Sequence, residues 1–315
     1  MHAFEWLIGL LLGAMLLSAL ARRLGVPYPT FLALGGIAIA FLPNSPNWTL
    51  EPTLALALFV APVLLDAAFD TSTRDLRDNW LPVTMLVLAA VGVTTVAVAF
   101  VARWLVPDMP WAAAVALGAI VAPPDAAAAT AILRSVRLPY RILKILEGES
   151  LLNDASALLI YRIAAGAAMA SSLRLEDVAP ALTLTLIGSL VAGYVLAQVM
   201  VRLFGRITDV PTAIIMQFAT TFVVWIVAEK LELSPILTIV IYAITLARSA
   251  PVRTTARLRV PSYAVWESVV FLLNVMAFVL IGMQLRPIWS GLDDDVRWHY
   301  CIAAGIVLAT VIAVR

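Results

Sequence analysis

Residues 147–162 read EGESLLNDASALLIYR, a stretch that places acids, an amide and a hydroxyl at the start of an apolar helical pattern. Ser150 and Asp154 are four positions apart, so in a helix their side chains stack one turn apart on a shared face. Asp154 lies about twelve residues into the apolar stretch 142–169, roughly 18 Å along a helix that rises about 1.5 Å per residue. In a membrane-spanning helix, this spacing predicts a carboxyl group near the middle of the hydrocarbon layer.

The composition of the whole chain supports a membrane environment. Of 315 residues, 63% are hydrophobic and 13% are charged, and the mean hydropathy is +0.98. Soluble domains carry about 25% charged residues because their surfaces face water, so a water-soluble globule is excluded. The net charge of +1 gives no sign of a nucleic-acid partner, and the single cysteine, Cys301, excludes a disulfide within the chain.

Apolar stretches that approach or cross a hydrocarbon layer of about 30 Å recur along the chain, and we count about eleven. They are residues 3–21, 30–42, 52–69, 80–105, 111–133, 142–169, 179–203, 211–229, 235–250, 264–286 and 298–315. We therefore expect an all-α polytopic protein in which residues 1–315 form a single membrane-embedded domain. The last stretch runs to Arg315 with no polar tail, an ending expected of a chain that is truncated at its C-terminus.

The basic residues predict the orientation of these stretches, because cytoplasmic loops retain Lys and Arg. Most of them follow odd-numbered stretches, including Arg22, Arg77, Arg141 and Arg257. We therefore expect a multi-pass protein of the cytoplasmic (inner) membrane, with its N-terminus outside.

Asp154 is a functional candidate because an ionisable group at mid-depth is costly unless it is paired or hydrated. Its carboxylate and the Ser150 hydroxyl are hard oxygen ligands, which suit a small alkali cation. Partial dehydration also favours the protonated carboxyl group, so a proton and a cation would compete for one site. Such competition predicts exchange of one for the other. The alternative is that Asp154 is a buried structural acid, hydrogen-bonded to neighbouring helices.

The segment ALGAIVAPPDAAAATAIL predicts an interrupted helix. Pro123 and Pro124 lack an N–H group, so they release carbonyl groups near Ala119 and Ile120. At mid-depth such carbonyls are tolerated only where they face protein or a watery cavity. Asp125 either balances the positive end of the helix that restarts there or takes part directly in ion or proton movement.

Two further acids lie near this predicted site. Glu149 is four residues from Asn153 and needs a partner, since an unpaired buried carboxylate is costly. Arg248, at the end of the stretch 235–250, is the leading candidate, and its alternative role is to anchor the cytoplasmic end of that stretch. Asp66 either lines a cytoplasmic entrance or has no functional role.

Four motifs occur in the order found in one transporter family: PVLLDAAF (62–69), APPDAAAA (122–129), EGESLLNDASALLIYR (147–162) and WESVVFLLNVMAFVLIGMQL (266–285). From about Asp66 to its end, the chain resembles the CPA1 monovalent cation:proton antiporters, the bacterial sodium/proton exchangers related to animal NHE proteins. The block at 147–162 is the longest and most specific of these motifs.

The resemblance implies roles for several residues. Asn153 and Asp154 match the family's Asn-Asp pair, in which the aspartate binds the cation and the proton, and Ser150 resembles an additional cation ligand. Glu149 resembles the acid that pairs structurally with the arginine at 248. The chain departs from the family at two positions. Asp66 stands where members usually carry Glu, and Pro124-Asp125-Ala126 replaces Thr-Asp-Pro, so a threonine hydroxyl is absent.

The resemblance also implies a fold and an activity. The fold is NhaA-like, with an inverted repeat relating the fourth to sixth stretches to the ninth to eleventh, and with two broken helices crossing at the midplane. The second break is implied by the resemblance alone, because the stretch 264–286 contains no proline. The activity is secondary antiport of Na⁺, K⁺ or Li⁺ against H⁺ in pH homeostasis, with no cofactor. Asn153 predicts electroneutral exchange, and members are typically homodimers within the lipid bilayer.

The sequence leaves two other functions as alternatives to antiport. An intramembrane hydrolase would use Asp125 and Asp154, or Ser150, but no Gly-x-Gly-Asp or Gly-x-Ser-x-Gly motif surrounds these residues. A cation channel would need a selectivity filter, and no repeated filter sequence is recognisable. The choice among sodium, potassium and lithium depends on cavity dimensions and stays open at this level.

Overall fold

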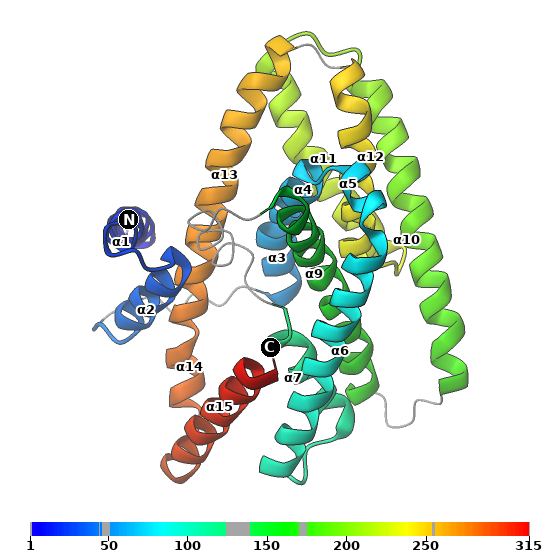
Figure 1. Cartoon of the computed structure of the whole chain (residues 1–315). Helices are drawn as coiled ribbons and strands as arrows, with labels where there is room; N and C mark the ends of the chain where they lie inside the picture. Colours follow the sequence, from blue (N-terminus) through cyan, green and yellow to red (C-terminus); the bar gives the residue numbers. More distant parts are fainter. Residues whose placement is uncertain are drawn as a thin grey trace.

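The computed structural model describes residues 2–43, 45, 51–123, 139–169, 175–253 and 256–314. Within these ranges the chain is helical and contains no β-strand (Figure 1). The elements are α1 (His2–Leu24), α2 (Tyr28–Ala40), α3 (Pro52–Ala55), the π-helix η1 (Leu56–Val60), α4 (Ala61–Asp70), α5 (Thr73–Asp78), α6 (Trp80–Leu105), α7 (Trp111–Val121), α9 (Tyr140–Met169), α10 (Leu175–Phe204), α11 (Val210–Lys230), α12 (Pro235–Arg253), α13 (Ala256–Met283), α14 (Leu285–Ser290) and α15 (Asp294–Val314).

The described helices have the length and surface of membrane spans. Seven helical segments are long and apolar enough to cross a membrane, among them α6, α10 and α11, and three shorter apolar helices include α2 and α7. Large apolar side chains are exposed along them, for example Leu16, Leu184 and Trp104. A continuous exposed apolar surface suits lipid and not water. The chain is therefore a multi-pass membrane protein, as its sequence predicted.

Proline residues interrupt two of these helices where the sequence places them. In the segment α3–η1–α4, Pro62 has no N–H to bond to the Leu58 carbonyl, and the chain is wound as a π-helix immediately before it. α7 ends at Val121, immediately before Ala122 and Pro123. The predicted interruption at the two prolines is thus present on its N-terminal side, while Pro124 and Asp125 lie outside the described residues.

No equivalent interruption occurs in α13, where the family resemblance implied the second broken helix. α13 runs without a gap from Ala256 to Met283, and its interior proline, Pro261, lies in the first turns. The remaining turns contain no proline, so each backbone N–H keeps its normal acceptor. The local sequence therefore decides the continuity of this helix.

Buried apolar side chains form several clusters, which divide most of the helices into three groups. The α12 group contains α4, α10, α11 and α12 around Trp225, and parts of α9 and α13 also pack into this cluster through Leu151 and Trp266. The α13 group joins α13 to α1 and α2 around Leu32, and the α9 group joins α6, α7 and α9 around Val87. The groups are therefore joined at the Trp225 cluster, and a cavity can persist where their side chains do not fill the space between them.

Within the groups, glycine allows helices to approach closely. A Cβ atom on Gly282 of α13 would lie closer than 3.0 Å to the Ala33 carbonyl oxygen of α2, and Gly36 of α2 meets α13 in the same way. In the α9 group, Gly118 of α7 faces the Thr95 carbonyl of α6 just as closely. These backbone contacts resemble the small-residue interfaces of membrane helices.

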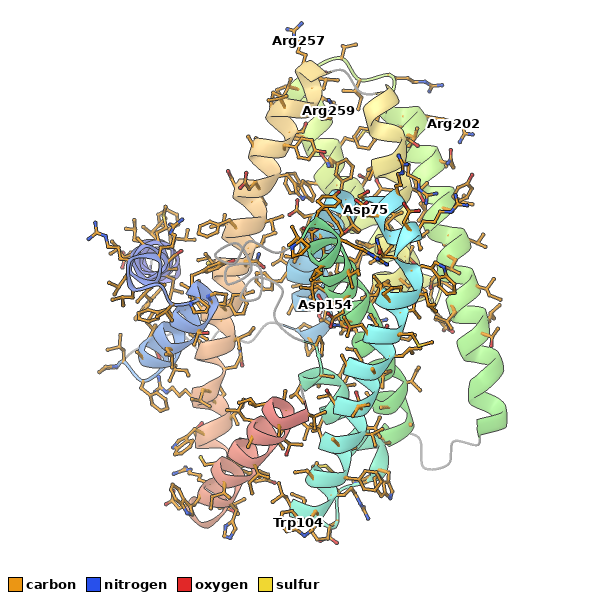
Figure 2. The ribbon with its side chains drawn as sticks, viewed as in Figure 1. Asp75, Trp104, Asp154, Arg202, Arg257 and Arg259 are labelled. Atoms are coloured by element: carbon orange, nitrogen blue, oxygen red, sulfur yellow. The ribbon has the colours of Figure 1, made fainter. Side chains whose placement is uncertain are left out.

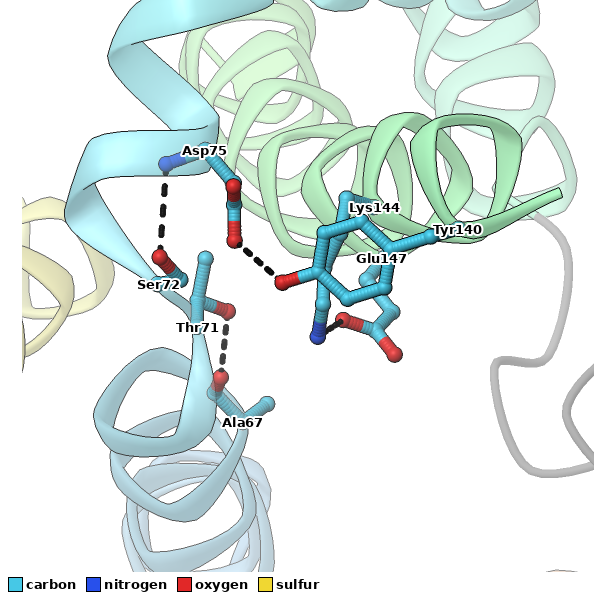
Figure 3. Close-up of polar contacts among 7 residues, drawn as sticks. All are labelled: Ala67, Thr71, Ser72, Asp75, Tyr140, Lys144 and Glu147. Atoms are coloured by element: carbon cyan, nitrogen blue, oxygen red, sulfur yellow. Dashed lines mark hydrogen bonds and ion pairs between the residues drawn. The ribbon is translucent and has the colours of Figure 1, made fainter.

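A polar cluster ties α5 to the start of α9 (Figure 3). Tyr140 donates a hydrogen bond of 2.9 Å to the Asp75 carboxylate, and Arg141 donates one of 3.0 Å to the Asn79 side chain. Ser72 caps α5 by accepting a hydrogen bond from the Asp75 backbone N–H at 3.3 Å. The cluster connects the segment after α4 to the helix that carries Asp154.

The α2–α13 contact predicts the effect of one added methyl group. We expect Gly282→Ala to lower the melting temperature of the purified protein, because overpacking against backbone costs about 1–3 kcal/mol. Gly305→Ala on α15 is the matched control, since nothing lies within 4 Å of its added Cβ. That variant should keep or raise the melting temperature, because alanine favours helix over glycine. Equal melting temperatures for the two variants would contradict the packing.

The polar cluster predicts a pH-dependent contribution to stability. Hydrogen bonds from Ser72 and then Tyr140 hold the pKa of the Asp75 carboxyl below its usual value of 3.8. A lowered pKa adds stability above the unfolded pKa, and this stability is lost as the pH falls through the folded pKa. Tyr140→Phe should therefore lower the melting temperature slightly at neutral pH and not at pH values below the folded pKa. Tyr194→Phe, at an exposed tyrosine on α10, should show no such difference.

Candidate functional site

Asp154 lies at mid-height in the bundle. Figure 2 labels Arg202, Arg257 and Arg259 near one end and Trp104 at the other, with Asp154 between them. An arginine-rich end and an end with exposed tryptophan are typical of the two interfacial regions of a membrane protein. The position agrees with the predicted depth of this carboxyl group.

Asp154 opens onto a cavity of about 360 Å³ at the meeting of the three helix groups. A water molecule in the liquid occupies about 30 Å³, so the cavity has room for several waters. Its walls come from η1 and α4, the end of α7, α9 and α13. The lining residues are Phe59, Val60, Val63, Leu64, Ala119, Ile120, Pro123, Asp154, Ala157, Leu158, Tyr161, Asn274, Ala277, Phe278 and Ile281.

One face of α9 forms a wall of this cavity. Asp154, Ala157, Leu158 and Tyr161 are spaced i, i+3, i+4 and i+7, which places them along a single helical face. Ala157 is small and buried, so the wall recedes one turn beyond the carboxyl group. Asp154 therefore borders the cavity on this face of α9.

The end of α7 borders the same cavity. Ala119 and Ile120 line it, and Pro123 completes this part of the wall. Since Pro123 has no N–H, the Ala119 carbonyl lacks the helical donor four residues later. That the released carbonyl groups near Ala119 and Ile120 take part in the site stays a prediction.

Asn153, next to Asp154, points elsewhere. It is fully buried, and its Nδ2 donates a hydrogen bond of 2.8 Å to Glu149 Oε1 one turn earlier. Its Oδ1 is buried without a hydrogen-bond partner among the described residues. Ser150 is one turn before Asp154 but does not line the cavity. The structure thus joins Asn153 to Glu149 and separates that pair from the cavity.

The predicted partner of Glu149 lies on another helix. Arg248 is exposed near the end of α12, whereas Glu149 is buried on α9 and is bonded to Asn153. The ion pair between Glu149 and Arg248 therefore stays a prediction.

Asp66 faces a different cavity, of about 90 Å³, on the other side of α4. Val63 and Leu64 line the Asp154 cavity, whereas Leu65 and Asp66 line this second one, because successive helix residues turn to different faces. The second cavity also includes Arg259, which Figure 2 places toward the arginine-rich end. Asp66 therefore does not share the cavity of Asp154.

Two polar residues of the cavity were missed by sequence reasoning. Tyr161 belongs to the quoted motif but lies two turns beyond Asp154, and Asn274 lies in the apolar stretch 264–286. Asn274 falls on no single helical row with Glu267 and Gln284 of the same stretch, so its spacing gave no signal. That Asn274 lines the same cavity as Asp154 depends on the tertiary arrangement of α13 and α9, which spacing within one helix does not reveal.

The cavity combines one carboxylate with neutral oxygen atoms in a largely apolar wall. Such a set can replace part of the hydration shell of a monovalent cation, and the carboxylate can instead take up a proton. Among the described residues that line the cavity, Asp154 is the acid. The chemistry that the described residues support is reversible binding of a cation or a proton.

Sequence relatives of the chain are transport proteins. Residues 9–315 match the family described as "Sodium/hydrogen exchanger, transmembrane". The chain is 31% identical over 290 residues to the sodium, potassium, lithium and rubidium/H(+) antiporter of Bacillus subtilis (strain 168), covering 90% of this chain and 43% of that protein. It is 33% identical over 283 residues to an uncharacterized Na(+)/H(+) exchanger of Escherichia coli (strain K12), covering 86% of this chain and 51% of the relative. The chain thus spans about half the length of these curated relatives.

A solved antiporter has the same architecture. The sodium proton antiporter MjNhaP1 from Methanocaldococcus jannaschii is similar to the chain with a TM-score of 0.73, covering 90% of this chain and 70% of that one. The two sequences are 20% identical, so this likeness shows the fold alone. The chain has the all-α polytopic antiporter fold that its sequence motifs predicted.

The different surroundings of two neighbouring residues can be tested by cysteine labelling. In a Cys301→Ser background, we expect Asp154→Cys to react with a small cationic methanethiosulfonate, because position 154 lines the cavity. Asn153→Cys is the matched control on the same helix, and it should react at least about tenfold more slowly because it is buried. Mass spectrometry of the purified protein measures both rates. Equal rates at the two positions would contradict the geometry.

Proposed function

The chain belongs to the sodium/hydrogen exchanger family, and from this membership we propose that it exchanges a monovalent cation for a proton across a membrane at Asp154. The observation that carries the proposal is a carboxyl group at mid-depth that faces a cavity with room for several waters. An exchange site needs such a space, because two ions must reach the carboxyl group in turn.

The binding step rests on oxygen atoms around Asp154. A cation would lose part of its hydration shell to the carboxylate and to the carbonyl groups of Ala119 and Ile120. Ser150, one turn earlier on α9, is a further proposed ligand, and Asp125 is proposed to contribute from the interrupted helix. Protonation of Asp154 removes its negative charge and releases the cation. One carboxylate thus binds one ion at a time.

The release step rests on the boundaries between helix groups. Asp154 belongs to the α9 group, and the facing walls belong to the α12 and α13 groups. The Trp225 cluster includes Leu151 of α9 and Trp266 of α13, so a shift between groups would slide α9 and α13 against that cluster. Such a shift would expose Asp154 to one aqueous side and then to the other. Asp66, in its separate cavity, is proposed to attract cations at the arginine-rich end.

The remaining proposals concern orientation and assembly. The arginine-rich end in Figure 2 supports a cytoplasmic location for that end. We accordingly propose the cytoplasmic membrane as the location, with the N-terminus outside. A homodimer is also proposed, as is a structural ion pair between Glu149 and Arg248 beside the hydrogen bond from Asn153.

Replacing the carboxyl group tests the exchange site. In proteoliposomes carrying a pH-sensitive dye, Na⁺ addition should move protons with the wild type and not with Asp154→Asn, whose amide neither ionises nor binds a proton at neutral pH. Glu147→Gln is the matched control, because Glu147 is an exposed acid on the same helix, 2.6 Å from Lys144. Proton flux that survives in Asp154→Asn would disprove the assigned site, and cation flux without proton flux would indicate a channel.

The stoichiometry can be tested with an imposed membrane potential. If one carboxylate exchanges one cation for one proton, no net charge moves, and the rate should be the same with and without a potassium diffusion potential. The measurement is the initial rate of Na⁺-driven proton movement at both potentials. A rate that follows the potential would contradict one-for-one exchange while leaving antiport itself intact.

A further inference from the structure

The wall of the Asp154 cavity contains the side-chain amide of Asn274, which has no role in the exchange proposed above. Among the described residues that line the cavity, three carry polar side chains: Asp154 and Tyr161 from α9 and Asn274 from α13. The other lining residues have apolar side chains. Asn274 is half-buried, and its side chain makes no hydrogen bond with the described residues. A polar amide facing an apolar cavity without a protein partner is costly unless it binds something in that cavity.

The two helices present matching faces to the cavity. α13 contributes Asn274, Ala277, Phe278 and Ile281, which have the same i, i+3, i+4 and i+7 spacing as the cavity face of α9. In each face the first residue is polar and the next is alanine. α9 and α13 run in the same direction (Figure 1). The amide of Asn274 and the carboxyl group of Asp154 therefore lie toward the same end of the cavity, with a gap left by the alanines beside them.

We propose that Asn274 is a cation ligand that completes the Asp154 site, with its side-chain oxygen directed at a cation held on the carboxylate. A small alkali cation that has lost water needs several oxygen ligands, and the amide oxygen is a neutral ligand of that kind. A proton on Asp154 needs no such ligand, because it is bound covalently to one carboxyl oxygen. Asn274 thus favours the cation over the proton at a shared site.

Because Asn274 lies on α13 and Asp154 on α9, a cation bound by both residues would affect the spacing of these two helices. The helix that carries Asn274, α13, packs against α2 through the glycine contacts at Gly36 and Gly282. A cation bound by both residues bridges α9 and α13 across the cavity, and a proton on Asp154 does not. Bound cation and bound proton therefore stabilise different spacings of α9 and α13. This inference rests on the proposed exchange at Asp154.

The test separates cation binding from proton binding. Asn274→Leu keeps nearly the same volume and removes the oxygen, and Asn274→Asp restores an oxygen at the same place. We expect Asn274→Leu to raise the apparent KM for Na⁺ in proteoliposomes by at least about tenfold, the effect of losing one ligand worth ~1.4 kcal/mol. The maximal rate at saturating Na⁺ should change much less. Asn274→Asp should return the KM toward the wild-type value.

Gln198→Leu is the matched control, since it makes the corresponding amide-to-leucine change on α10 at a position that lines neither the Asp154 cavity nor the Asp66 cavity. It should leave the KM for Na⁺ within about twofold of wild type. An unchanged KM in Asn274→Leu would overturn this inference and leave the Asp154 site standing. Exchange that survives Asp154→Asn would instead overturn the proposed function.

A binding measurement covers the case in which Asn274→Leu is inactive. Na⁺ should raise the melting temperature of the detergent-purified wild type, because a bound ligand stabilises the folded state. In Asn274→Leu the Na⁺ concentration needed for this rise should increase about tenfold, while the melting temperature without Na⁺ stays close to wild type. A variant that melts far lower without Na⁺, yet needs the same Na⁺ concentration, would show a packing role and refute the ligand role.

Discussion

A carboxyl group at the middle of a lipid layer needs water or a binding partner, and the arrangement of the surrounding helices follows from this need. Asp154 meets it by facing a cavity of about 360 Å³. The cavity exists because α7 ends before Pro123 and because Ala157 and Ala277 leave space on the facing helices. Larger side chains at these two alanines, or a continuous α7, would bring apolar groups against the acid and raise the cost of its charge.

Two neighbouring residues on α9 have different surroundings. Successive residues on a helix turn by about 100°, so Asp154 and Asn153 face different surroundings. Asp154 lines the cavity, while Asn153 is buried and donates a hydrogen bond to Glu149. The Asn-Asp motif thus contains one residue that lines the cavity and one that is hydrogen-bonded within the helix. The same geometry on α4 sends Leu64 and Asp66 to different cavities.

Packing density differs within and between the helix groups, and this difference bears on movement. Gly36 and Gly282 bring α2 and α13 into backbone contact, and Gly118 does the same for α7 and α6. Such contacts join helices into rigid pairs. The boundary between the α9 and α13 groups contains the cavity instead, so fewer contacts resist a change in their spacing. The candidate site thus lies at a boundary that contains a cavity.

Much of this protein's helical structure can be predicted from its sequence, because in a bilayer the local pattern of apolar residues and prolines determines where helices form and end. Apolar length predicted the helices, the two prolines predicted the end of α7, and helical spacing with the antiporter motif singled out Asp154. The predictions of the helices succeed because backbone groups in lipid must bond within their own helix. Tertiary structure alone decided that Asn274 and Asp154 line one cavity, that Asp66 lines another and that Asn153 is buried beside Glu149. Contacts between helices distant in the chain depend on how whole faces pack together, and spacing within one helix carries no information about its neighbour's rotation.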